Sequence, residues 1–105
     1  MIKNHMLYIV LERFRDAPAV YRRFREKGRM LPDGLKYIDS WVELDGVRCF
    51  QLMECQDVQL IEEWARRWHD LVDFEIVPVQ GSKDAAARFD DSSGGPLPSS
   101  GRSTQ

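Results

Sequence analysis

The sequence predicts one small α+β domain over residues 1–80, with the element order β-α-β-β-α-β, and a flexible tail over residues 81–105. A chain of 105 residues has the length of a single domain. Two segments with apolar residues at helical spacing alternate with stretches rich in β-branched and aromatic residues. This order usually folds as a four-stranded antiparallel sheet in the strand order 4-1-3-2, with both helices on one face.

The first half of the pattern is a strand followed by a helix. Residues 5–13 carry apolar side chains on both faces, which is typical of a strand that is covered on both sides. Asp16 is a candidate N-cap, and Pro18 falls in the first helical turn, where its missing N–H costs nothing. Gly28 indicates the end of this helix.

The second half begins with a hairpin. The pair Asp45-Gly46 predicts a tight turn between strands over residues 35–45 and 47–55. Alternation predicts two faces for the first of these strands. One face then carries Ile38, Val42 and Leu44, and the other Tyr37, Asp39, Trp41 and Glu43.

A second helix, a last strand and the tail complete the chain. Asp57 is expected to cap the helix. The predicted buried stripe of this helix consists of Leu60, Ile61, Trp64, Trp68 and Leu71. Pro78 predicts that the strand over residues 72–80 lies at an edge of the sheet, because proline cannot donate to a ladder. From residue 81 onward serine, glycine and proline dominate, so we expect disorder except for a short helix near residues 82–89.

The two cysteines indicate a reducing compartment. Cys49 and Cys55 are six residues apart in one predicted strand, hence about 20 Å apart, which excludes a disulfide between them. Free thiols favour a reducing environment. The apolar run over residues 6–11 is too short for a signal or membrane segment, so we expect a cytoplasmic protein.

Charge is unevenly distributed along the chain. Residues 13–29 hold seven basic and two acidic side chains, whereas the whole chain has a net charge of −2. Two interpretations stay open for this stretch. The first helix either meets an anionic partner or is an ordinary solvated helix face, which is the commoner case.

One face of the predicted sheet stays uncovered when both helices lie on the other. Such a face has roughly 400 Å² in projection, and soluble monomers rarely leave so large an apolar patch open. We therefore expect a second copy of the chain, a ligand or nucleic acid to cover it. We assign to this face Met6, Tyr8, Val10, Tyr37, Trp41, Cys49, Met53, Val77 and Val79. The polar residues placed with them are Glu12, Asp39, Glu43 and Gln51.

The stretches FREKGRMLPDGLKYIDSWVE, RCFQLMEC and WHDLVDFEIVPV resemble a family of small bacterial proteins of unknown function. The resemblance covers residues 5–85 and leaves out the rest of the tail. This family is grouped with the dimeric α+β barrels, in which two ferredoxin-like sheets face each other. The resemblance thus implies a homodimer. Related barrels include cofactor-independent monooxygenases, small isomerases and haem-handling proteins, which is an analogy of fold alone.

Aromatic walls with a few polar groups predict a small-molecule pocket within the barrel or between sheet and helices. The expected ligand-binding residues are Tyr8, Tyr37, Asp39, Trp41, Gln51, Trp64 and Trp68, with His69 beside them. Asp39 and His69 are candidate acid–base groups, because a carboxylate or imidazole in a cleft can move a proton. Each also has a plainer interpretation, Asp39 as a wet residue at the rim and His69 as a partly exposed residue beside the helix stripe.

Two other functions fit the same element order. An RNA-recognition module would stack bases on aromatic residues of its central strands, and Tyr8 is suitably placed for this. Cys49, Gln51 and Met53 stand where further stacking aromatics would be needed, and carboxylates on that face would repel phosphates. A purely structural dimer is the remaining alternative. We predict neither a metal site nor a cofactor, because the histidines and cysteines lack ligand spacing.

Overall fold

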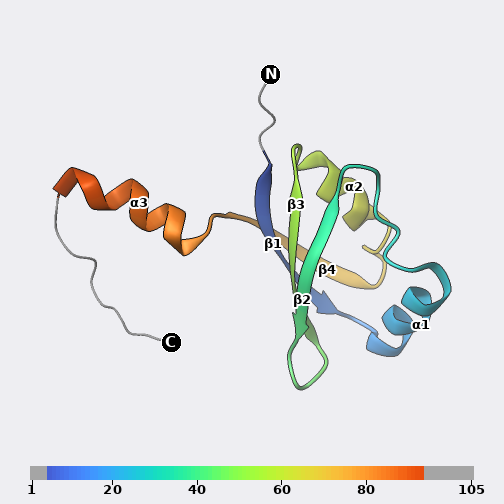
Figure 1. The fold of residues 1–105 in the computed structure, drawn as a ribbon. Coiled ribbons are helices and arrows are strands. Elements are labelled where there is room, and N and C mark those ends of the chain that lie inside the picture. The colour runs from blue at the N-terminus through green and yellow to red at the C-terminus, as the bar shows by residue number, and fades with distance from the viewer. Residues whose placement is uncertain (1–4, 94–105) are drawn as a thin grey trace.

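The computed structural model describes residues 5–93, and its first six elements follow the predicted order (Figure 1). The elements are β1 (Met6–Phe14), α1 (Ala17–Lys27), β2 (Lys36–Val42), β3 (Arg48–Cys55), α2 (Gln59–Arg66), β4 (Val72–Val79) and α3 (Ser82–Ser93). The strands form an antiparallel sheet in the order β2-β3-β1-β4, which is the predicted order 4-1-3-2 read from the opposite edge. Figure 1 shows α1 and α2 on the same side of this sheet.

The signals that delimit α1 act as predicted. The Asp16 carboxylate accepts a hydrogen bond from the backbone N–H of Ala19 over 3.1 Å, and Pro18 lies in the first turn. At the other end, Gly28 donates its N–H to the carbonyl of Phe24 and has a φ of 69°, which glycine adopts readily. The helix is thereby fixed in length and ends just before the loop that leads to β2.

The second helix is shorter than the apolar spacing suggested. Asp57 precedes α2, and its carboxylate accepts a bond from the N–H of Gln59 over 2.9 Å. The helix ends at Arg66, so Trp68 and Leu71 lie in the turns that follow it. Both tryptophans of the predicted stripe, Trp64 and Trp68, are nevertheless buried.

The structure reverses the predicted faces of the central strands. Tyr8 and Val10 of β1 are buried under the helices, and so are Cys49 and Met53 of β3, which we had assigned to the uncovered face. In the ladder between β1 and β3, Tyr8 lies beside Met53 and Val10 beside Gln51. Both parities of β1 are apolar, so the alternation alone does not reveal which side meets the helices.

An irregularity in β2 breaks the alternation predicted for that strand. The register with β3 shifts between Tyr37 and Asp39, which leaves Ile38 as an extra residue. Tyr37 therefore lies on the helix-covered face opposite Met53, whereas Asp39 and Trp41 lie on the open face. The predicted grouping of Tyr37 with Asp39 and Trp41 was wrong for this reason.

The open face of the sheet, which no helix covers, is apolar along its middle. Ile9 at the centre of β1 pairs with Leu52 on one side and Val77 on the other. The ladder places on the same face Leu7, Leu11, Phe50, Val79 and the exposed Trp41. The prediction of a large uncovered apolar face is therefore retained, with Trp41, Val77 and Val79 of the original assignment and with new members from β1 and β3.

The helix α3 is longer than the short helix predicted near residues 82–89. It extends away from the sheet (Figure 1), and its Phe89 is 60% exposed. The prediction of disorder for residues 94–105 lies outside the described residues.

Removal of residues 86–105 is expected to leave the fold and the oligomeric state unchanged. The deleted part of α3 contributes Phe89 as its large apolar side chain, and that side chain is mostly in solvent. Thermal unfolding followed by circular dichroism tests this. A fall in Tm of more than about 5 °C, which corresponds to ~1 kcal/mol for a domain of this size, would contradict the expectation.

Candidate functional site

A pocket of about 140 Å³ lies between the helix-covered face of the sheet and α1. Strands β1, β2 and β3 supply its floor, and α1 and the end of α2 supply its walls. Tyr21, Phe24 and Val42 line it and are each about 40% exposed, so the pocket opens to solvent between α1 and β2. Its other apolar lining residues are Phe14, Val20, Trp64 and Trp68. Its polar lining residues are Glu12, Arg29, Ser40, Cys49 and Gln51.

Glu12 and Gln51 form the polar centre of this pocket. Both side chains are buried, with 5% and 6% of their surface exposed, and the Gln51 amide Nε2 donates a hydrogen bond to Oε2 of Glu12. Burial raises the pKa of Glu12 from 4.5 to about 7, although the Gln51 bond and the charge of Arg29 act to lower it. Both protonation states of Glu12 are therefore populated near neutral pH, as an acid–base group requires.

The loop that carries Arg29 is fastened to the second helix and its following turn. The indole N–H groups of Trp64 and Trp68 both donate to the backbone carbonyl of Arg29, over 2.8 Å and 3.0 Å. Arg67 donates to the carbonyl of Met30, which has a φ of 60° in the left-handed region that methionine rarely adopts. These contacts hold the loop in a strained backbone conformation that places Arg29 over the pocket.

The Arg29 guanidinium is positioned by a ring and by an amide. Its central carbon lies 3.6 Å from the centre of the Tyr37 ring, a cation–π contact. Its Nε lies 3.5 Å from Oε1 of Gln51, to which it donates. Since Arg29 holds the amide oxygen, the amide N–H₂ group of Gln51 is directed at Glu12.

Cys49 lines the same pocket but is a poor nucleophile. Burial, followed by the nearby charge of Glu12, raises the pKa of the Cys49 thiol to about 12. The reactive form of cysteine is the thiolate, which is scarce at neutral pH under these conditions. Cys49 and Cys55 are both buried and free.

The structure brings together some of the predicted ligand-binding residues. Gln51, Trp64 and Trp68 all line the pocket, and Tyr37 supports it from behind Arg29. Tyr8 is instead a core residue under the helices, so it offers no stacking surface on the open face for RNA.

Asp39 and Trp41 lie on the opposite side of the sheet from the pocket. Trp41 is 53% exposed there, and the Asp39 carboxylate accepts a bond from the adjacent N–H of Ser40. Asp39 therefore has no access to the pocket as an acid–base group.

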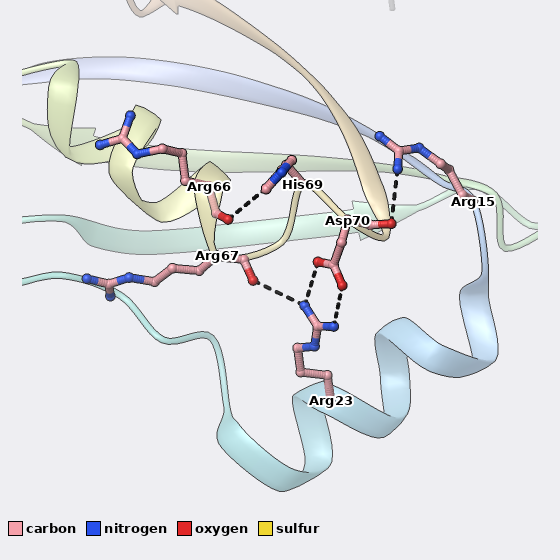
Figure 2. Close-up of polar contacts among 6 residues, drawn as sticks. All are labelled: Arg15, Arg23, Arg66, Arg67, His69 and Asp70. Atoms are coloured by element: carbon pink, nitrogen blue, oxygen red, sulfur yellow. Dashed lines mark hydrogen bonds and ion pairs between the residues drawn. The ribbon is translucent and has the colours of Figure 1, made fainter.

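His69 lies among charged side chains (Figure 2). It is exposed and does not line the pocket. Its Nδ1 is 2.9 Å from the carbonyl oxygen of Arg66. Beside it, Arg23 donates to both carboxylate oxygens of Asp70, over 2.8 Å and 2.6 Å, and Arg15 donates to the Asp70 carbonyl. The Arg23 contact lowers the pKa of Asp70 to about 2.

This cluster accounts for part of the basic stretch around the first helix. Arg23 pairs with Asp70 and Arg15 pairs with Asp73, whose pKa the Arg15 contact also lowers. The first pair joins α1 to the turn before β4, and the second joins the residue after β1 to the start of β4. These ion pairs connect elements of the fold, so Arg15 and Arg23 have a structural role that needs no anionic partner.

Glu12 and Arg29 were not among the predicted site residues. A signal for Glu12 does exist in the sequence, since a lone carboxylate at the same parity as Val10 and Phe14 interrupts an apolar strand face. The sequence analysis assigns that face to the uncovered side of the sheet, and so does not predict a position for Glu12 under the helices. Arg29 lies in a loop, and its position depends on a left-handed residue and two distant indoles that leave no local pattern.

The part of the chain that the structure describes contains no group of three histidine, cysteine or acidic residues placed to hold a metal ion. Within residues 5–93, none of the helices combines the length and the apolar character needed to cross a bilayer.

Fold and pocket together define the class of protein, a ferredoxin-like α+β domain with a small polar-centred pocket under its helices. The chain belongs to the family described as a domain of unknown function, DUF3303, whose family model matches residues 6–92. The match includes nearly all of α3, although the sequence had suggested that the tail begins at residue 81. Comparisons with curated proteins and with solved structures gave no match.

Proposed function

We propose that this domain binds a small organic molecule in the pocket between the sheet and α1. The observation that supports this is a buried carboxylate, Glu12, at the floor of an aromatic cavity that opens to solvent. An aromatic cavity with a few convergent polar groups is the usual composition of a ligand site. The volume of about 140 Å³ suits a molecule the size of one six-membered ring.

The energetic cost of Glu12 supports the same proposal. A carboxylate in an apolar site destabilises a fold, and leucine or methionine in its place would stabilise it more. Arg29 is likewise held over the pocket by a strained loop, with Met30 in the left-handed region. Buried charges and strained backbone conformations that destabilise a fold are commonest at sites where a ligand is bound or transformed.

The three tryptophans provide a direct test in solution. Titration of ring-sized compounds, toluene and phenol, is expected to shift the indole N–H resonances of Trp64 and Trp68 in nitrogen–proton correlation spectra. Trp41 lies on the opposite face of the sheet and serves as an internal control, so its resonance should stay in place. If neither compound moves Trp64 or Trp68, the proposal fails.

A variant pair assigns these shifts to the pocket. Val42→Phe is expected to fill the mouth and to weaken binding by about tenfold or more, which corresponds to ~1.4 kcal/mol. Leu44→Phe is the matched control, because Leu44 is fully exposed in the hairpin beyond β2. Equal binding by both variants would place the ligand elsewhere.

We also propose that the domain is a homodimer packed through its open face. Ile9, Leu52 and Val77 lie side by side on that face, at the middle of three neighbouring strands. An apolar sheet face of this extent is rarely left in water by a soluble monomer. A purely structural dimer would account for the open face but not for the polar pocket on the opposite side.

Two buried free thiols support a reducing compartment, and we propose the cytoplasm as the location.

A further inference from the structure

We infer that the ligand of this pocket is a neutral, ring-sized molecule with one O–H or N–H group that donates a hydrogen bond to Glu12. This inference rests on the proposed ligand-binding function and specifies the chemical class of the ligand. It follows from the hydrogen-bonding capacity of Glu12, from the charges around the pocket, and from the volume of the cavity.

Glu12 has accepting capacity that the fold leaves unused. A carboxylate can accept about four hydrogen bonds through its two oxygens. Within residues 5–93, the group that donates to Glu12 is the Gln51 amide, and it does so at Oε2. Glu12 is 5% exposed and lines the cavity, so a ligand in the cavity can bring a donor to the remaining oxygen.

Gln51 cannot reverse its role to meet a different ligand. Its Oε1 accepts from Arg29, so a flip of the amide would direct the N–H₂ group at the guanidinium and the oxygen at the carboxylate. Both contacts would then become repulsive. The polar centre is therefore fixed as an acceptor site, and a ligand with a donor complements it.

The charges around the pocket favour a ligand without net charge. Glu12 comes from β1 and Arg29 from the loop after α1, and the other titratable groups at the wall are Cys49 of β3 and Tyr21 of α1. A ligand cation would meet Arg29, and a ligand anion would meet Glu12. A neutral donor avoids both repulsions and keeps the existing pair in place.

The volume limits the size of the ligand. A dry cavity of about 150 Å³ in another protein holds benzene, and this pocket has about 140 Å³. Its walls are the rings of Phe14, Trp64 and Trp68 together with the half-exposed rings of α1. One ring with one polar substituent therefore fills the space and reaches Glu12.

Phenol and toluene form a matched pair of probes, because a hydroxyl group in one replaces a methyl group in the other. Both are titrated into the full chain, and the indole resonances of Trp64 and Trp68 report binding. At pH 8, where phenol itself is still neutral, phenol is expected to bind at least about tenfold more tightly than toluene. The preference should shrink at pH 6, because protonated Glu12 is a weaker acceptor.

Glu12→Gln is expected to remove the preference and its pH dependence while toluene still binds, which shows that the pocket is intact. Glu75→Gln is the matched control, since Glu75 is exposed on the open face of β4. Equal affinity for phenol and toluene in the wild type at both pH values would overturn the inference yet leave the ligand-binding function standing. Failure of both probes to bind would count against the function itself.

Discussion

Between pH 4 and pH 8, the free energy of unfolding of the wild type is expected to fall by roughly 3 kcal/mol more than that of the Glu12→Gln variant. Burial raises the pKa of Glu12 from 4.5 to about 7 in the folded chain. Between these values the unfolded chain has already lost the proton that the folded chain still holds. The unfolded state thus binds fewer protons, and the stability of the wild type falls as the pH rises through this window.

The size of the effect follows from the two pKa values. Their difference is about 2.5, and one pKa unit corresponds to about 1.4 kcal/mol, so the full loss is roughly 3 kcal/mol once the pH exceeds 7. The variant carries an amide that does not titrate and that can still accept from Gln51. At pH 8 the variant should therefore be the more stable protein, and at pH 4 the difference should largely vanish.

Urea unfolding at a series of pH values measures this difference. All residues other than residue 12 are the same in both proteins, so their contributions cancel in the comparison. Glu75→Gln is again the control, because its carboxylate is exposed and its variant should follow the wild type. Parallel stability curves for wild type and Glu12→Gln would show that Glu12 is not buried as described.

Element order and strand order were predictable because their signals are local. A cap at Asp16, a break at Gly28 and a turn at Asp45-Gly46 each act on a few neighbouring residues. The first two operate as the sequence indicated, and the hairpin does turn at Asp45-Gly46. Its connection is longer than predicted, because β2 ends at Val42 and β3 begins at Arg48. Pro78 likewise lies in an edge strand. Such signals fix where the elements lie along the chain and which strands can be adjacent.

The side of the sheet that meets the helices was not predictable from alternation. Both faces of β1 are apolar. Leu7 and Ile9 on one side could therefore pack against the helices as well as Tyr8 and Val10 on the other. Tyr8 and Met53 fill space under the helices, and the local alternation does not mark them for that side. A one-residue shift in β2 then moves Tyr37 to the same side.

The candidate site inherited that error in a specific way. Gln51, Trp64 and Trp68 were identified as members of a pocket with aromatic walls, although Gln51 was placed on the uncovered face. Glu12 was placed on the uncovered face with Asp39 and Glu43, so its burial against Gln51 under the helices was not predicted. When Tyr8, Val10 and Glu12 are assigned to the helix-covered face of β1, Glu12 faces Gln51 and the aromatic walls. These two residues then form the polar centre of the pocket.

The corrected faces make opposite predictions for two aspartate substitutions in neighbouring strands. Ile9→Asp is expected to leave the monomer folded and to weaken the proposed dimer at least about 100-fold, since an unpaired carboxylate in the interface costs about 3 kcal/mol or more. Met53→Asp is expected to unfold the chain, because Met53 is fully buried under the helices and the introduced carboxylate would be cut off from water.

Light scattering at micromolar concentration and circular dichroism separate these outcomes. The wild type should scatter as a dimer, Ile9→Asp as a folded monomer, and Met53→Asp should lose its helical signal. The apolar neighbours of Ile9 are Leu52 and Val77, so the new charge would lie at the centre of the open face and not at its polar rim. A wild type that is monomeric at these concentrations contradicts the dimer. A dimeric Ile9→Asp would locate the interface elsewhere, and the apolar face would then need another occupant.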